Sequence, residues 1–265
     1  MRTEPRTLCR RINPMHTFSL IRSGGTSCVF LWGFLLMVGC LGDVGEEAAE
    51  SGSILNVEDI NAYYDAEDAT AESNQVDVVQ GLCRTGEGEE VTYEPEWFSD
   101  HYLRVTITNR PLPNRTKEEQ TASPVEITSY TVTYSPQPVR WDVPPLEPYV
   151  GVPLQDTQVI EPCEPESTCE GTEYIGLTLM NLDKKDEYVE KVCGDSRCLD
   201  TPPTVPYPDL CEWYPSPLGG YCPWTTHQGQ YTAHYTFLGE NIFGKKVSCN
   251  GDLSFFVHDY DHCED

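Results

Sequence analysis

The sequence predicts an all-β body, built as an antiparallel β-sandwich, behind an export segment and an acidic stretch. Several short runs alternate between apolar and polar residues with the period of two that half-buried antiparallel strands require. Proline, glycine and asparagine separate these runs, as is typical of turns between strands. Only residues 182–192 have the spacing of a short helix, and no regular alternation of strands and helices indicates a parallel sheet.

The first 39 residues are predicted to be an export signal. Residues 1–40 contain five arginines and one glutamate, and Arg22 is followed by an apolar run over residues 29–38 and by Gly39. A basic flank, a short apolar run and a small residue are the features of such a signal. The run is too short for a spanning helix, which needs about 20 apolar residues. Either Met1 or Met15 fits as the start of this segment.

Residues 40–75 are predicted to be an acidic flexible tether. Residues 41–80 contain eleven aspartates and glutamates and no lysine or arginine. A segment of this kind has too little apolar surface to offset the entropy lost on ordering. Within it, residues 54–64 have enough apolar side chains to form a short helix or to dock on the body.

Residues 76–265 are predicted to form the β-sandwich. Leu103, Val105 and Ile107 alternate with polar residues and are expected to face the core. Ile175, Leu177 and Leu179 are expected to do the same in a later strand. The strands are expected within residues 76–83, 101–109, 125–134, 157–160, 173–180, 230–238 and 246–257.

The cysteines predict a disulfide-bonded protein. The chain has twelve cysteines, nine of them after Cys40, and an exported chain uses such residues for disulfides. Their spacings do not match the usual zinc knuckle, and no Cys-x-x-Cys-His motif for haem is present. Short loops favour the pairs Cys163–Cys169, Cys193–Cys198, Cys211–Cys222 and Cys249–Cys263. Cys83 is then left over, or it displaces one of these partners by crossing between strands.

Residues 193–224 are a cysteine- and proline-rich insertion, and the aromatic loop within it, over residues 207–224, is the candidate for recognition. Its aromatic side chains could stack on sugars or anchor a protein partner if a disulfide holds them rigidly at the surface. The alternative is that they form a small satellite core. The candidate binding residues are Tyr207, Trp213, Tyr214, Tyr221 and Trp224.

The motifs give no support for catalysis. Residues 239–246, GENIFGKK, nearly match a phosphate-binding loop but join two expected strands, so they predict a hairpin turn. The tail from His258 to Cys263 collects metal-capable groups, which makes metal binding there the alternative to a solvated chain end. We expect no catalytic residue, no metal and no cofactor. The net charge of −26 disfavours nucleic acid as a partner.

The residues MVGC at 37–40 resemble the lipobox of bacterial lipoproteins. This resemblance implies that Cys40 is lipidated and becomes the first residue of the mature protein. An ordinary cleaved signal, which would leave Cys40 as a plain thiol, is the alternative. Leu41, with no aspartate at that position, implies the outer membrane under the sorting rule of that family.

Three segments carry a second resemblance: HYLRVTITNRP, VEITSYTVTYSP and the final YTAHYTFLGENIFGKKVSCNGDLSFFVHD. Together they resemble immunoglobulin-like or fibronectin-III-like domains of exported bacterial lipoproteins and cover about half of the mature body. The insertion over residues 193–224 departs from that pattern.

Together these features predict a membrane-anchored exported lipoprotein that acts as a non-catalytic structural or binding module at the cell envelope. Its expected partners are the membrane, through the lipid anchor, and a protein or a glycan. One alternative is a carbohydrate-binding module that uses the aromatic loop of residues 207–224. The other is a metal-dependent hydrolase that uses the acidic tail.

Overall fold

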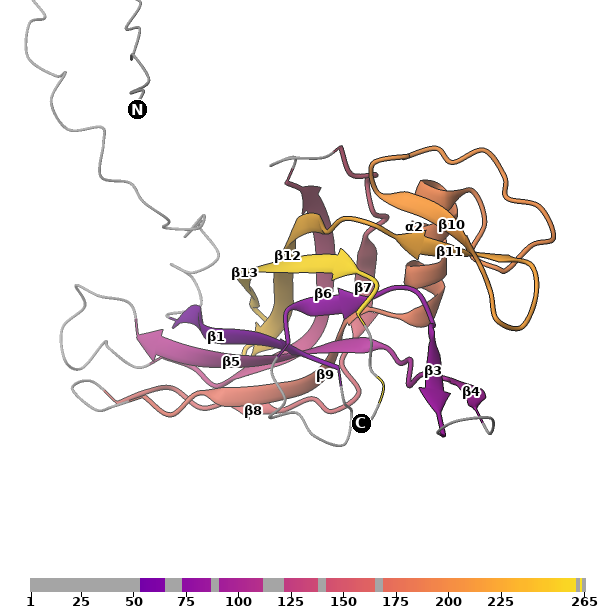
Figure 1. The fold of residues 1–265 in the computed structure, drawn as a ribbon. Coiled ribbons are helices and arrows are strands. Elements are labelled where there is room, and N and C mark those ends of the chain that lie inside the picture. The colour runs from indigo at the N-terminus through magenta and orange to yellow at the C-terminus, as the bar shows by residue number, and fades with distance from the viewer. Residues whose placement is uncertain are drawn as a thin grey trace, which may run out of the picture. The chain divides into compact units, whose positions relative to one another are not determined.

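The computed structural model describes residues 53–64, 73–86, 91–111, 122–137, 142–164 and 169–260, together with Cys263. All of them belong to the second of two compact units, Gly42–Asp265. The described residues form mainly antiparallel strands with one helix, so the predicted all-β class is confirmed (Figure 1). The predicted signal and the lipidation site at Cys40 lie outside the described residues.

The larger sheet has six strands in the order β2-β13-β12-β6-β7, with β8 also paired to β6. Its pairs are antiparallel, except that β2 runs parallel to β13. The predicted strand over residues 76–83 is divided in two, because the chain leaves the sheet after Asp77. The strands of this sheet are β2 (Gln75–Asp77), β6 (Val125–Pro136), β7 (Tyr149–Pro153), β8 (Val159–Ile160), β12 (Gly229–Asn241) and β13 (Lys246–His258).

The smaller sheet consists of β1 (Ser53–Tyr63), β5 (His101–Pro111) and β9 (Thr172–Met180), in that order. The prediction of a flexible tether over residues 40–75 is therefore wrong for β1, which pairs with β5 over its whole length. The register shifts at Glu58, so the core-facing side chains change from odd to even positions along β1. This bulge hides the period of two and explains why the sequence does not look like a strand.

The core lies between these two sheets. Leu103, Val105 and Ile107 of β5 are fully buried, as predicted, in one apolar cluster with residues of β6, β12 and β13. The two sheets approach each other closely at Gly251 of β13, since a Cβ atom there would lie 3.0 Å from a methyl group of Val57. The absence of a side chain at this position lets β1 pack directly on β13.

Ile175 does not face the core, which corrects the inward set predicted for β9. The register of β9 on β5 shifts next to Gly176, whose φ of 79° is a conformation that glycine adopts easily. This shift buries Tyr174 and leaves Ile175 55% exposed. Tyrosines of the larger sheet reach the β9 backbone beyond the bulge: Tyr235 Oη donates to the Thr178 carbonyl at 2.9 Å.

Helix α2 (Leu182–Cys193) confirms the predicted short helix. Asn181 caps its start by accepting a hydrogen bond from the Lys184 backbone at 3.0 Å, and Gly194 ends it in the left-handed conformation. The cysteine-rich insertion continues as a hairpin of β10 (Cys211–Pro215) and β11 (Tyr221–Thr225). A second small hairpin consists of β3 (Leu82–Thr85) and β4 (Thr92–Pro95).

Four disulfides form among the described residues, and most of the predicted pairs are wrong. Only Cys163–Cys169 forms as predicted. Helix α2 carries Cys193 away from Cys198, and the chain then returns so that Leu199 pairs with Tyr221. The remaining disulfides are Cys193–Cys211, Cys198–Cys222 and Cys83–Cys263.

Cys249 is the free cysteine of the described part, in place of Cys83. It lies two residues after Val247, on the same core-facing side of β13, and is 5% exposed. Burial raises the pKa of its thiol to about 12. Cys249 is therefore an apolar core residue with an unreactive sulfur.

Candidate functional site

The β10–β11 hairpin presents an aromatic face, which we define as Glu212, Tyr214 and Trp224. Glu212 pairs directly with Trp224, so these side chains project from the same side of the hairpin. Tyr214 is 49% exposed and Trp224 is 40% exposed. Their ring centroids lie 6.2 Å apart in an edge-to-face arrangement, and Tyr214 Oη donates to Glu212 Oε2 at 2.7 Å. The face combines two exposed aromatic rings with a carboxylate.

The other predicted aromatic residues do not join this face. Trp213 points to the opposite side, packs against the core, and donates from Nε1 to the Cys193 carbonyl at 3.2 Å. Tyr207 is also partly buried, and its carbonyl accepts hydrogen bonds from Leu210 and Cys211. Tyr221 is 38% exposed but occupies the register position opposite Pro215. The predicted set of five thus separates into the exposed pair Tyr214 and Trp224, an exposed Tyr221 that does not join them, and the partly buried Tyr207 and Trp213.

Two disulfides hold the aromatic hairpin in place. Cys193–Cys211 joins its first strand to the end of α2, and Cys198–Cys222 joins its second strand to the preceding loop. The turn between the strands uses Gly219 and Gly220, both with positive φ. A surface that is ordered before binding loses less conformational entropy when a ligand arrives.

A buried acidic cluster, consisting of Asp77, Glu96 and Asp259, is the second unusual feature. One carboxylate oxygen from each residue lies within 4.8 Å of the others. The residues are 1%, 3% and 8% exposed, respectively. Asp77 ends β2, Glu96 follows β4, and Asp259 follows β13, so the cluster is assembled from three segments that are distant in sequence.

Backbone amides orient two of these carboxylates. Asp77 Oδ1 accepts hydrogen bonds from the amides of Val79, at 3.4 Å, and Tyr260, at 3.2 Å. Glu96 Oε1 accepts one from the amide of Gly81. Asp77 Oδ2 is also buried, but it has no hydrogen-bond partner among the described residues. Burial raises the pKa of Asp77, and the nearby Glu96 carboxylate raises it further.

Lys185 of α2 is the cation that acts on Asp77. It is 1% exposed, and burial lowers the pKa of its ammonium group. Its Nζ donates to the Ser99 carbonyl at 2.5 Å and lies 4.3 Å from the centroid of the Phe98 ring. Lys185 thus contacts a carbonyl and an aromatic ring, and it interacts electrostatically with the carboxylates of Asp77, Asp100 and Glu96.

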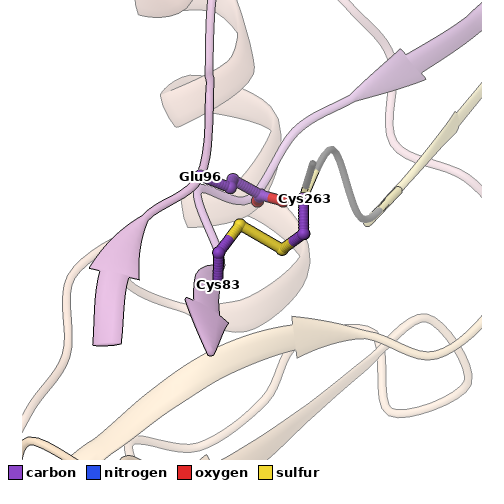
Figure 2. Close-up of side chains that lie close together, drawn as sticks. All are labelled: Cys83, Glu96 and Cys263. Atoms are coloured by element: carbon purple, nitrogen blue, oxygen red, sulfur yellow. A yellow bond between two sulfur atoms is a disulfide. The ribbon is translucent and has the colours of Figure 1, made fainter. Parts of the chain in front are cut away.

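The Cys83–Cys263 disulfide lies beside the cluster. Figure 2 shows the Glu96 carboxylate next to this bridge, and its oxygen and the two sulfurs lie within 4.8 Å of one another. Cysteine binds a metal through its thiolate, so Cys83 and Cys263 are not metal ligands while they form the disulfide. The bridge instead fixes the chain after Asp259 to the β3 strand, next to Glu96.

A small hollow adjoins the cluster. It encloses about 150 Å³, including the open space at its mouth, and Asp77 and Lys185 contribute to its wall. The other lining residues are Tyr64, Trp97, Phe98, Ser99 and His101. Trp97 is 46% exposed, so the hollow lies near the surface of the body.

Sequence reasoning identified the acidic tail but not this cluster. His258 is half-buried, with Nδ1 3.4 Å from Thr225 Oγ1, and burial lowers its pKa. His262 lies outside the described residues. Asp77 and Glu96 belong to no motif. The pairing of β2 with β13 brings Asp77 to Asp259, and hydrogen bonds between Glu96 and Gly81 hold Glu96 beside them.

The chain matches no family model, no curated protein and no solved structure. In the part of the chain that the structure describes, no helix combines the length and the apolar character that crossing a membrane requires. The described residues define an all-β, disulfide-bonded body with an exposed aromatic face.

Proposed function

We propose that this chain is an exported, lipid-anchored protein of the bacterial cell envelope whose β-sheet body is a non-catalytic binding module. The disulfides carry this proposal. Eight of the nine cysteines that follow Cys40 are paired, and disulfides of this number persist in oxidising compartments outside the cytosol. Export through the segment that ends in MVGC, with lipidation of Cys40, would take the chain to such a compartment.

The position at which the chain enters the body supports membrane attachment. Ser53, the first residue of β1, donates from Oγ to the Ser123 carbonyl at 3.3 Å. The next residue, Pro124, accepts a hydrogen bond from the Ile242 amide at 3.3 Å, so the entry point lies beside the β12–β13 turn. Residues 41–52 can span at most roughly 40 Å when fully extended. A lipid on Cys40 would therefore hold this end of the body close to the bilayer.

The turn at that end has side chains suited to a membrane surface. Ile242 is 67% exposed and Phe243 is 73% exposed, and Lys245 and Lys246 follow them. At the surface of an anionic bilayer, apolar side chains enter the headgroup region and neighbouring lysines bind the negatively charged lipids. In a chain with a net charge of −26, this local combination of apolar and basic residues favours contact between the turn and lipid.

Intact mass under non-reducing conditions tests the proposal. The full chain, expressed in a Gram-negative bacterium and recovered from membranes, should begin at Cys40, carry acyl chains and contain four disulfides. Cys40→Ala should abolish acylation and leave the disulfides intact. An unacylated protein with reduced cysteines in the soluble cytoplasmic fraction would overturn the proposal.

A glycan is the ligand that the aromatic face favours. Exposed rings such as Tyr214 and Trp224 can stack on the apolar faces of sugars, and the Glu212 carboxylate can accept hydrogen bonds from hydroxyl groups. Glycan-array binding should be lost in Trp224→Ala and retained in Phe243→Ala, a control at an exposed aromatic residue outside this face. Equal binding by both variants would exclude this face as the glycan site.

We also propose that the two-sheet body is immunoglobulin-like or fibronectin-III-like. The mainly antiparallel pairing within the two main sheets and the core shared between them support this finer assignment. The alternative of a metal-dependent hydrolase depends on His258 and His262, and nothing in the described residues favours it.

A further inference from the structure

We propose that the acidic cluster of Asp77, Glu96 and Asp259 binds a divalent cation, and that calcium is the ion that fits it. The inference does not depend on the lipid anchor or on the aromatic face. It follows from the charge of these three buried residues, from the Oδ2 atom of Asp77, which has no hydrogen-bond partner among the described residues, and from the positions of the carboxylate oxygens.

The charge balance of the cluster calls for a cation. The cluster contains three buried carboxylates, and Lys185 interacts electrostatically with two of them, Asp77 and Glu96, so two negative charges remain when all four groups are ionised. Lys185 donates its hydrogen bond to the Ser99 carbonyl. Buried charges are costly unless they are paired or coordinate a metal. One divalent cation would neutralise the charge that Lys185 leaves uncompensated.

The Asp77 side chain provides an independent sign of a ligand. It is 1% exposed, and its Oδ2 atom has no hydrogen-bond partner among the described residues. Its other oxygen accepts two backbone hydrogen bonds, which fix the orientation of the carboxylate. An orphaned, oriented oxygen next to the other two carboxylates is in a position to coordinate a metal.

The ligand chemistry favours calcium. All three residues provide oxygen ligands, which hard cations prefer. One oxygen of Asp77 and one of Glu96 already accept backbone hydrogen bonds, so the remaining ligand set is irregular. Calcium accepts irregular arrangements of six to eight oxygens, whereas magnesium demands a nearly ideal octahedron.

The bound ion would act as a structural clamp. β2 is a parallel strand of three residues at the edge of the larger sheet, and Asp259 directly follows β13. A cation between Asp77, Glu96 and Asp259 would join these segments to the chain after β4. The Cys83–Cys263 disulfide joins the same region covalently, so the two links would reinforce each other.

Terbium luminescence and thermal unfolding test the site on the purified full-length protein. Tb³⁺ replaces Ca²⁺ at oxygen sites, and Trp97 and Tyr260, which directly follow two of the ligands, would sensitise its emission. We expect one Tb³⁺ per chain, displaced by Ca²⁺, and a rise in Tm when CaCl₂ replaces EDTA. Mg²⁺ should displace Tb³⁺ at least tenfold less effectively than Ca²⁺.

Two variants make the test specific. Asp77→Asn keeps the size and the backbone hydrogen bonds of Asp77, and should weaken Tb³⁺ binding at least tenfold and abolish the calcium-dependent rise in Tm. Asp252→Asn, at an exposed aspartate on β13, is the matched control and should behave as the parent does. The proposal fails if the parent does not respond to calcium while Asp77→Asn is the more stable protein, because a proton then neutralises the cluster. It also fails if both variants bind Tb³⁺ as the parent does.

Discussion

Replacing Asp77 by asparagine should remove a pH-dependent loss of stability that the parent shows between about pH 4 and pH 7 in the presence of EDTA. Burial raises the pKa of Asp77 from 3.8 to about 7 in the folded protein. Between these two values the folded state binds more protons than the unfolded state, so the free energy of unfolding falls as the pH rises. The loss begins near pH 4 and is complete above pH 7.

The pKa values set the size of the effect. A difference of about three pKa units corresponds to at most about 4 kcal/mol, since each unit is worth 1.36 kcal/mol. Asparagine cannot ionise, so this contribution disappears in the variant. Lys185 has the opposite trend at higher pH, because burial lowers its pKa to about 8 and stability then rises with pH between about 8 and 10.5. The comparison is therefore confined to pH 4–7.5.

Urea unfolding, monitored by tryptophan fluorescence at intervals over this pH range, measures the difference between the parent and Asp77→Asn. Glu58, whose pKa is lowered by a hydrogen bond from Thr108 and by Arg110, loses its stabilising contribution as the pH falls, and so does Glu187, whose pKa is lowered by two lysines. Both losses occur in both proteins. Their effect cancels in the difference. Asp156→Asn, at an exposed aspartate outside the cluster, serves as the control here and should follow the parent. Parallel curves for the parent and Asp77→Asn would refute the idea that Asp77 is buried in a repulsive cluster.

Three further predictions concern other parts of the molecule. If the β12–β13 turn enters a bilayer, Phe243→Trp in vesicle-reconstituted full-length protein should add fluorescence that brominated lipids quench. Leu218→Trp, at a similarly exposed position on the β10–β11 hairpin, should add fluorescence that these lipids do not quench, and equal quenching would contradict the assignment of the turn. Replacing both Cys193 and Cys211 by serine should lower the free energy of unfolding, measured by urea denaturation, by about 3 kcal/mol. The disulfide joins residues 18 positions apart, and its loss increases the conformational entropy of the unfolded chain. Peptide mapping should find Cys249 unlabelled by a maleimide at pH 8 in the folded protein and labelled after denaturation without reductant, and labelling of the native protein would show that this thiol is not buried.

The elements predicted most accurately are those whose signals are local. β5 and β12 alternate without interruption, so periodicity alone assigns their inward faces. Helix α2 has an asparagine cap before it and a glycine after it, and both signals lie within the segment itself. The excess of cysteines is likewise read directly from composition, whereas the export segment stays a prediction because it lies outside the described residues.

Bulges account for the errors in the strands. The extra residue at Glu58 in β1 and the turn at Gly176 in β9 each change which side chains face the core. A strict period of two therefore misses β1 and places Ile175 inside, although it is exposed. The position of a bulge depends on the partner strand, and the sequence of one strand does not contain that information.

By itself, the sequence determined the all-β class, the short helix and the presence of nine cysteines after Cys40. Tertiary structure alone decided which cysteines pair, because α2 and the return of the chain at Leu199 set their neighbours. It also decided that Tyr214 and Trp224 share an exposed face and that Asp77, Glu96 and Asp259 meet in the interior. The physical reason is common to all three: periodicity and capping act between residues close in sequence, whereas disulfides and buried charge clusters depend on segments that only the folded chain brings together.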